Sequence, residues 1–223
     1  PISTFSSLAI VSENRVFLKP KKMSKIEAVL YGCAIPTGAG IVINQLKNIK
    51  NNHKVCLIGV GGVGMAALLA LSKKSSKIFI VEKNHDKIKK IIKKFNMNVI
   101  KSSNLKKYSS FFDFCVETSG STNMIELGFD LINNKGKLIF ASHPKNSKKI
   151  KLNPHDFISG KKIYGSWGGN CKLDNDIDKI FKYFNKNNVF STYGKISFFS
   201  LREINYAFKK VLSGKINRAI IKF

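Results

Sequence analysis

One turn, Gly59-Val60-Gly61-Gly62-Val63-Gly64, constrains the fold of this chain more than any other sequence feature. An apolar run, Val55–Ile58, precedes the turn, and a helix is predicted directly after it, over Met65–Lys74. Glycines at this spacing serve three purposes: a tight turn, close approach of a ligand to the backbone, and close packing of helix on strand. The N-terminus of the helix then offers N–H groups and partial positive charge to phosphates. The pattern therefore predicts a pyrophosphate-binding turn, and its contacts are Gly59, Gly61, Gly62, Val63 and Gly64.

An acidic residue supports this interpretation and indicates the cofactor. Glu82 follows the next apolar run, Lys77–Val81, and lies 23 positions after the first glycine, close to the spacing of about 20 that is usual for a ribose-binding acid. Its carboxylate can accept hydrogen bonds from both adenosine ribose hydroxyls and would repel a 2′-phosphate. NAD(H) is therefore expected rather than NADP(H), although Lys83 and Lys87 could neutralise a phosphate. Lys87 is included among the cofactor-binding candidates.

Strands and helices are predicted to alternate along the middle of the chain. Strands are expected over Val55–Ile58, Lys77–Val81, Asn98–Lys101, Phe112–Thr118, Lys137–Ala141 and Lys162–Ser166. Helices are expected between them over Met65–Lys74, Asp86–Phe95 and Asn123–Asn133. This alternation predicts an α/β Rossmann fold, a doubly wound parallel sheet with helices on both faces.

The two ends of the chain depart from that alternation. Strands are predicted over Phe5–Val11, Arg15–Leu18, Phe190–Phe198 and Ala219–Phe223. Helices are predicted over residues 24–31, Ile41–Ile49, Asp176–Asn187 and Leu201–Ser213. Ser24 and Glu27 have the spacing of a capping box at the start of the first of these helices, and Gly214 is placed to end the last one.

The strong positive charge does not by itself indicate a nucleic-acid partner. Lys and Arg number 39 against 13 Asp and Glu, which gives a net charge of +26. Arg15, Arg202 and Arg218 are the only arginines, and the lysines are scattered along the chain. Nucleic-acid binders instead gather arginine with exposed aromatic residues on one face. We therefore expect no nucleic-acid partner.

The cysteines and the apolar segments indicate the compartment. Cys33, Cys56, Cys115 and Cys171 are far apart and form no Cys-x-x-Cys pair, which is typical of a reduced, cytoplasmic protein. No apolar run approaches the roughly 20 residues of a membrane helix, and Pro1 to Ser7 do not resemble a signal peptide. We expect no membrane partner.

Five segments, taken in order, resemble the medium-chain, zinc-type alcohol dehydrogenase family nearly end to end. Besides the glycine turn with Glu82, they are Gly32-Cys-Ala-Ile-Pro-Thr-Gly38, Glu117-Thr-Ser-Gly120, Gly165-Ser-Trp-Gly-Gly169 and Leu212-Ser-Gly-Lys-Ile-Asn-Arg218.

This resemblance implies roles for individual residues. Cys33 matches a ligand of the catalytic zinc, and Thr37 matches a residue of the catalytic site that packs against the nicotinamide. Further cofactor contacts are implied at Thr118 and Ser119 along the dinucleotide, Ser142 and His143 beside the nicotinamide, Ser166 and Trp167 at the carboxamide, and Arg218 at the pyrophosphate.

The resemblance also implies a division of the chain. Residues 1–34 would be the end of a mixed α+β, GroES-like catalytic domain, residues 35–166 the NAD-binding Rossmann domain, and residues 167–223 a return to the catalytic domain. The other two zinc ligands and the proton-relay hydroxyl of the family precede the first of these segments. Because one cysteine cannot hold a catalytic zinc, the chain alone is expected to bind a dinucleotide and to be inactive. It is either a fragment of a longer zinc enzyme or a short, zinc-free relative.

The expected reaction of the intact enzyme is hydride transfer between an alcohol, aldehyde or polyol and NAD. One alternative is a zinc-independent quinone or enoyl reductase that uses NADPH, against which Cys33 and Glu82 argue. The other is a non-enzymatic basic protein that binds nucleotides or nucleic acid. The resemblance further implies a homodimer or homotetramer, joined through the edge strand Lys162–Ser166.

Overall fold

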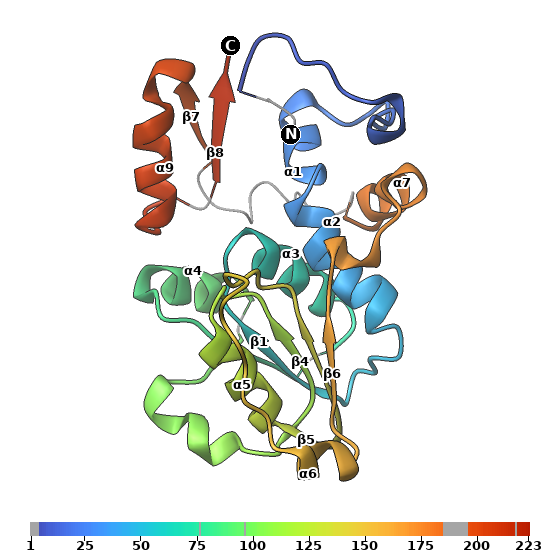
Figure 1. The fold of residues 1–223 in the computed structure, drawn as a ribbon, viewed down its shortest axis with the longest axis vertical. Helices are drawn as coiled ribbons and strands as arrows, with labels where there is room; N and C mark the ends of the chain where they lie inside the picture. The colour runs from blue at the N-terminus through green and yellow to red at the C-terminus, as the bar shows by residue number, and fades with distance from the viewer. Residues whose placement is uncertain (1–4, 76, 96, 185–195, 217) are drawn as a thin grey trace. The chain divides into compact units, whose positions relative to one another are not determined.

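The computed structural model describes residues 5–75, 77–95, 97–184, 196–216 and 218–223 (Figure 1). The chain divides into two compact units, which are described separately below. One unit is Cys33–Cys171, and the other combines Pro1–Gly32 with Lys172–Phe223. The division into residues 1–34, 35–166 and 167–223 expected from the sequence stays a prediction.

A six-stranded parallel sheet forms the centre of the unit Cys33–Cys171 (Figure 1). Its order is β3-β2-β1-β4-β5-β6, and the order reverses between β1 and β4. Ligands of such sheets bind in the crevice at the carboxyl ends of the strands, next to this reversal. The Rossmann fold predicted from the alternation is confirmed. The strands are β1 (Lys54–Ile58), β2 (Lys77–Val81), β3 (Asn98–Val99), β4 (Phe112–Glu117), β5 (Ile132–Phe140) and β6 (Lys162–Gly165).

Flanking helices cover the apolar side chains of this sheet. A buried cluster that includes Cys56, Cys115 and Leu138 lies under Ile125 and Phe129, which both belong to α5. Burial of such side chains is the main favourable term in folding. The helical segments of this unit are α2 (Ala34–Gly40), a π-helical turn η2 (Ile41–Gln45), α3 (Gly62–Leu71), α4 (His85–Phe95), η3 (Ser102–Tyr108), α5 (Thr122–Leu131), α6 (Pro154–Ile158) and η4 (Gly168–Asn170).

The helix predicted over Ile41–Ile49 is displaced towards the N-terminus. The structure has α2 from Ala34, followed by the π-helical turn that ends at Gln45. The cause is packing, because a Cβ at Gly38 would lie only 2.1 Å from the carbonyl oxygen of Val63 in α3. Glycine is a poor helix former, but here the close contact between α2 and α3 outweighs that local preference.

The other unit contains a small βαβ arrangement and two further helices. The parallel strands β7 (Ile196–Ser200) and β8 (Arg218–Lys222) are joined through η5 (Leu201–Glu203) and α9 (Ile204–Leu212). The predicted strand Phe190–Phe198 and the end of the predicted helix Asp176–Asn187 fall partly on residues 185–195, outside the described residues.

Helix α1 (Lys25–Tyr31) confirms the predicted capping box at its start. The backbone N–H of Ser24 donates to Glu27 Oε2 at 2.7 Å, and the backbone N–H of Glu27 donates to Ser24 Oγ at 3.2 Å. The ring of Tyr31 meets Phe181 of α7 (Leu173–Phe184) edge to face at 5.6 Å. This contact joins the two ends of the chain within this unit.

The strands predicted near the N-terminus are wrong. Residues 5–53 contain no strand, and the segment 5–20 has only one short 3₁₀ turn, η1 (Glu13–Arg15). Apolar residues alone do not make a strand, since a strand needs a neighbour to pair with. Leu8, Ile10 and Leu18 are 87, 100 and 94% exposed.

No single helix in the described ranges is both long and apolar enough to cross a bilayer, and only the pair Lys25–Tyr31 and Ala34–Gln45 passes that test when taken together.

Candidate functional site

The glycine turn has the geometry that its spacing predicts. Gly59 has φ +82°, a conformation that glycine adopts without strain. A Cβ at Gly64 would lie 2.1 Å from the carbonyl oxygen of Gly59 and 2.7 Å from Thr118 Oγ1. The first residue therefore makes the turn, and Gly64 lets α3 approach the end of β1.

Gly61 provides the open side of the turn. A Cβ built there would meet no atom within 4 Å. Gly61 is the N-cap of the ten-residue helix α3, and no side chain caps that end. A helix that begins on glycines suits a pyrophosphate, since backbone N–H groups and the helix dipole attract the anion. The residues present fit a dinucleotide at this position.

Glu82 joins the glycine turn to the end of β2. Its Oε2 accepts the backbone N–H of Val60 at 2.8 Å, and its Oε1 accepts those of Lys83 and Asn84 at 2.9 and 3.0 Å. A carboxylate has about four acceptor positions, so capacity remains for a ribose hydroxyl. Lys83 is exposed and Lys87 is half-buried.

The residues that follow the strands are held by backbone hydrogen bonds across the sheet. At the carboxyl ends, the N–H groups of four residues each donate to a neighbouring strand: Gly59 to Val81 O, Thr118 to Ile58 O, Ala141 to Glu117 O and Ser166 to Phe140 O, at 2.8–2.9 Å. The ladder thus continues one residue beyond β1, β4, β5 and β6. These four contacts are called the edge ladder below.

Thr118, Ser119 and Ser142 come together beside the glycine turn. Thr118 Oγ1 donates to the carbonyl oxygen of Gly59 at 2.8 Å. Ser142 Oγ accepts the backbone N–H of Gly120 at 2.6 Å. Three of the predicted cofactor contacts therefore share one surface, at the strand-order reversal between β1 and β4.

The sequence interpretation assigned no role to Glu117, which underlies this surface. Its side chain is fully buried, and its Oε1 accepts both the backbone N–H and the Oγ–H of Ser119 at 2.6 Å. Its position at the end of a central strand, directly before a predicted contact, was the available signal.

The thiols of Cys56 and Cys115 lie on neighbouring strands of the same sheet. Burial raises the pKa of the Cys115 thiol well above its ordinary value, and the hydrogen bond to Cys56 and the charge of Glu117 act in the same direction. A thiol in this state is a core residue and not a nucleophile.

Ser166, Trp167 and His143 form a second group at the carboxyl edge. Ser166 Oγ donates to Gln45 Oε1 at 2.6 Å. The ring of His143 meets Trp167 edge to face at 5.2 Å, and Trp167 is 84% exposed. The ring of Trp167 is thus available to a ligand, while the hydrogen bond to Gln45 fixes the side chain of Ser166.

The π-helical turn holds this group, and its polar residues were missed from the sequence. Asn44 Nδ2 donates to the carbonyl oxygens of Gly169 and Asn170 at 3.4 and 3.3 Å. Asn44 and Gln45 directly follow the apolar run Ile41-Val-Ile, and that change from apolar to polar was the available signal. π turns occur frequently at functional sites.

Thr37 belongs to the same assembly. Its Oγ1 donates to the carbonyl oxygen of Cys33 at 2.8 Å, and the side chain is half-buried. Gly169 has φ +68°, and a Cβ there would lie 2.5 Å from the carbonyl oxygen of Thr37. Segment η4 therefore packs directly on α2, which brings Thr37 and the Ser166–Trp167 segment onto one support.

The described residues around Cys33 do not form a metal site. Cys33 is exposed and directly precedes α2. Within the described ranges, no three His, Cys, Asp or Glu side chains are grouped closely enough to hold a metal ion. One thiolate does not fit a catalytic zinc, which takes three protein ligands. Arg218 belongs to the other unit, so its expected contact with the pyrophosphate stays a prediction.

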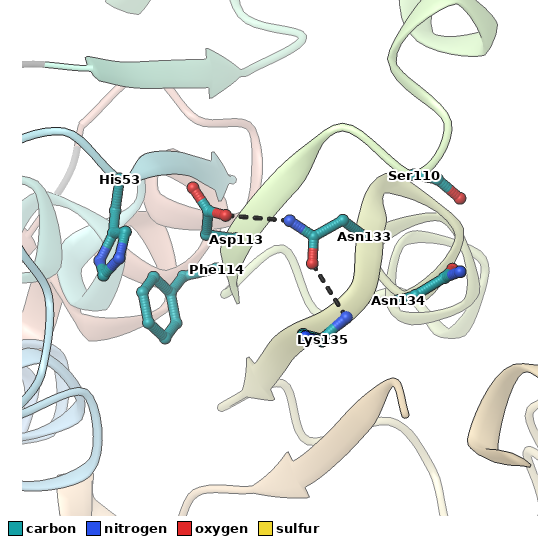
Figure 2. A pocket seen from close by; sticks show the side chains of 7 residues that line it. All are labelled: His53, Ser110, Asp113, Phe114, Asn133, Asn134 and Lys135. Carbon is teal, nitrogen blue, oxygen red and sulfur yellow. Dashed lines mark hydrogen bonds between the residues drawn. The ribbon is translucent and has the colours of Figure 1, made fainter. Parts of the chain in front are cut away.

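A cavity of about 610 Å³ lies at the opposite edge of the sheet, where β1, β4 and β5 begin (Figure 2). Asp113 and Asn133 line it side by side, and Asp113 Oδ1 accepts Asn133 Nδ2–H at 2.9 Å (Figure 2). The other oxygen, Oδ2, accepts the backbone N–H of Lys54 at 2.8 Å. His53 packs edge to face on Phe114. These groups satisfy one another and fix the strand starts, far from the glycine turn.

The comparisons with known proteins agree with this geometry. An alcohol dehydrogenase of Malus domestica is 29% identical over 99% of this chain. The chain is similar to alcohol dehydrogenases. It spans 60% of the length of that relative. A family model described as shikimate / quinate 5-dehydrogenase matches residues 41–131, which include the glycine turn and β1 to β4.

Solved structures share the fold. Benzyl alcohol dehydrogenase from Acinetobacter calcoaceticus superposes with a TM-score of 0.85 and 23% identity, over 96% of this chain and 61% of that one. Acetophenone reductase from Geotrichum candidum, solved in complex with NAD, superposes with a TM-score of 0.72 and 18% identity, over 92% of this chain and 57% of that one.

Proposed function

We propose that this chain binds NAD(H) at the carboxyl edge of its sheet and is the cofactor-binding part of a zinc-type alcohol dehydrogenase. The observation that carries the proposal is the glycine turn. Gly59 has positive φ, Gly61 is open to a ligand, and Gly64 is in close contact with the end of β1. Similarity to alcohol dehydrogenases over 99% of the chain supports the same class of reaction.

The residues of this chain would bind and orient the dinucleotide. The start of α3 takes the pyrophosphate, and Glu82 takes the adenosine ribose. Thr118 and Ser119 line the path towards the nicotinamide. Thr37, Ser142, His143, Ser166 and Trp167 then hold the nicotinamide end, with Arg218 on the pyrophosphate.

Bound NAD would supply the hydride chemistry, with an alcohol or aldehyde as the other substrate. A cofactor fixed with one face against the protein presents the other face to the substrate, and the surrounding side chains exclude water. Orientation of this kind lowers the entropic part of the barrier.

Zinc belongs to this proposal only for a longer protein. Cys33 can supply one thiolate, and the described residues near it do not complete a tetrahedral set. We therefore derive no catalytic step through a metal. The proposal predicts that this chain binds NADH and does not oxidise alcohols alone.

A titration of the 223-residue chain with NADH tests the proposal. We expect enhanced and blue-shifted NADH fluorescence, with weaker binding of NADPH because Glu82 repels a 2′-phosphate. Tighter binding of NADPH would favour a quinone or enoyl reductase instead. No fluorescence change, together with a salt-dependent gel shift on nucleic acid, would indicate a basic nucleic-acid-binding protein.

A further inference from the structure

The carboxylate of Glu117 is buried, and Glu117 is not one of the proposed cofactor contacts. It is the last residue of β4, and its side chain is 0% exposed. Among the described residues, its Oε2 is buried and has no hydrogen-bond partner. A buried polar atom without a partner costs free energy. Some other contribution of this side chain must offset that cost.

Oε1, the other oxygen of this carboxylate, makes two short contacts. It accepts from the backbone N and from Oγ of Ser119, both at 2.6 Å. Such short contacts are typical of hydrogen bonds to a charged acceptor, which are stronger than neutral ones. Ser119 itself is exposed. The carboxylate therefore reaches out of the core and fixes a surface residue.

Ser119 in turn lies against the glycine turn. A Cβ at Gly59 would be 3.0 Å from both the backbone N and the Cα of Ser119. Thr118, between Glu117 and Ser119, donates its hydroxyl to the carbonyl oxygen of Gly59. The Glu117 carboxylate, Ser119 and the first residue of the turn thus form one continuous stack.

We propose that Glu117 is a positioning residue of the dinucleotide site: by holding Ser119 against Gly59, it sets the shape of the pyrophosphate-binding turn. This inference rests on the proposed NAD(H) binding. Glu117 does not touch the cofactor, and it acts through Ser119. The role requires an acceptor at the position of Oε1, while Oε2 contributes nothing to it.

Because the two oxygens have different surroundings, two variants of Glu117 should affect NADH binding and stability in opposite ways. Glu117→Gln keeps an acceptor for Ser119 but places an NH₂ group where Oε2 lacks a partner. Glu117→Leu removes both polar atoms, and the freed N–H of exposed Ser119 can bind water. Replacement of a buried polar group that lacks hydrogen-bond partners by an apolar group of similar size is often neutral for stability.

The experiment measures the NADH dissociation constant and the thermal midpoint for each variant of the full chain. We expect Glu117→Leu to weaken NADH binding about tenfold, with a midpoint within about 2 °C of the unmodified chain. Glu117→Gln should bind within about threefold, with a midpoint several degrees lower. A merely structural role would move binding and stability together.

Asp113→Asn is the matched control. Asp113 is a carboxylate at the other end of β4, where it accepts the backbone N–H of Lys54. This variant should lower the midpoint and leave NADH binding unchanged. If Glu117→Leu does not fold, Ser119→Ala tests the same contact from the surface, with an expected loss of about threefold.

Three outcomes would overturn the inference or its basis. Unchanged binding in Glu117→Leu and Ser119→Ala would refute the positioning role while NADH binding itself stands. Equal loss of binding in Glu117→Gln and Glu117→Leu would show that the acceptor is not what matters. Absence of NADH binding by the unmodified chain would instead refute the proposed function.

Discussion

Glu82 and Val60 are joined by a hydrogen bond of 2.8 Å, from the backbone N–H of the turn residue to the carboxylate at the end of β2. The same carboxylate was expected from the sequence to bind only the ribose. Its position therefore couples two parts of the site, since the acid that would bind ribose also holds the pyrophosphate turn.

Replacement of Glu82 should affect one cofactor more than the other. Glu82→Ala removes an acceptor for the ribose hydroxyls and a support for the turn, and it also removes the repulsion of a 2′-phosphate. We expect NADH binding to weaken about tenfold or more, equivalent to roughly 1.4 kcal/mol, and NADPH binding to weaken less. Fluorescence titration with both cofactors measures this. Asp86→Ala, an exposed acid in the first turn of α4, is the control; equal losses for the two cofactors would refute the ribose role.

Two glycines of the turn should respond in opposite ways to the same substitution. A Cβ at Gly61 meets nothing within 4 Å, so Gly61→Ala should fold normally but obstruct the pyrophosphate and weaken NADH binding at least tenfold. A Cβ at Gly64 would lie 2.1 Å from a carbonyl oxygen, so Gly64→Ala should lower the thermal midpoint by many degrees. Thermal unfolding with NADH titration separates the two. Normal NADH binding by Gly61→Ala would contradict the assignment of the turn.

Trp167 offers a direct optical test of the nicotinamide end of the site. It is the single tryptophan of the chain and is 84% exposed. If NADH binds beside it, the indole loses contact with water and transfers energy to the reduced nicotinamide, so its emission should fall and shift to shorter wavelength. The variant His155→Ala, at an exposed position on α6, keeps the indole and should retain the effect. Unchanged emission at saturating NADH would place the nicotinamide elsewhere.

The edge strand β6 is expected to join copies of the chain. It is the last strand of the sheet and pairs on one side with β5. Pairing of two copies about a two-fold axis would cover its other edge. Sedimentation should give at least twice the mass of one chain. Tyr164→Lys, at a half-exposed position on this strand, should shift the mass towards the monomer. Ile158→Lys on α6 is the control, and a monomeric unmodified chain would refute the proposal.

The alternating core of the fold was predictable because each element carries its own local signal. Strand β2 has the predicted bounds Lys77–Val81, since four residues of high strand propensity, Ile78 to Val81, end at an acid and a turn. The glycine turn was predictable for the same reason, because the conformation of Gly59 and the packing of Gly64 depend on a single absent side chain.

The failures occur where the outcome depends on a distant partner. Residues 5–18 are apolar enough for strands, but no strand pairs with them. Strand β5 begins at Ile132, directly after α5, whereas the sequence predicted a helix up to Asn133. Pairing of Ile132 with Phe112 explains the early start. Asn44, Gln45 and Glu117 were missed because their partners lie elsewhere in the fold or in a turn that the pattern alone does not define.

The edge ladder gives the binding surface a property that loops rarely have. Gly59, Thr118, Ala141 and Ser166 lie beyond their strands, but their amides donate into the sheet. In hydrogen–deuterium exchange, these four amides should behave as part of the sheet and exchange slowly even without a ligand. The surface is then ordered before a cofactor arrives, and little conformational entropy remains to be lost on binding. Affinity for a dinucleotide would thus depend on the rigidity of the sheet as much as on the residues that touch the ligand.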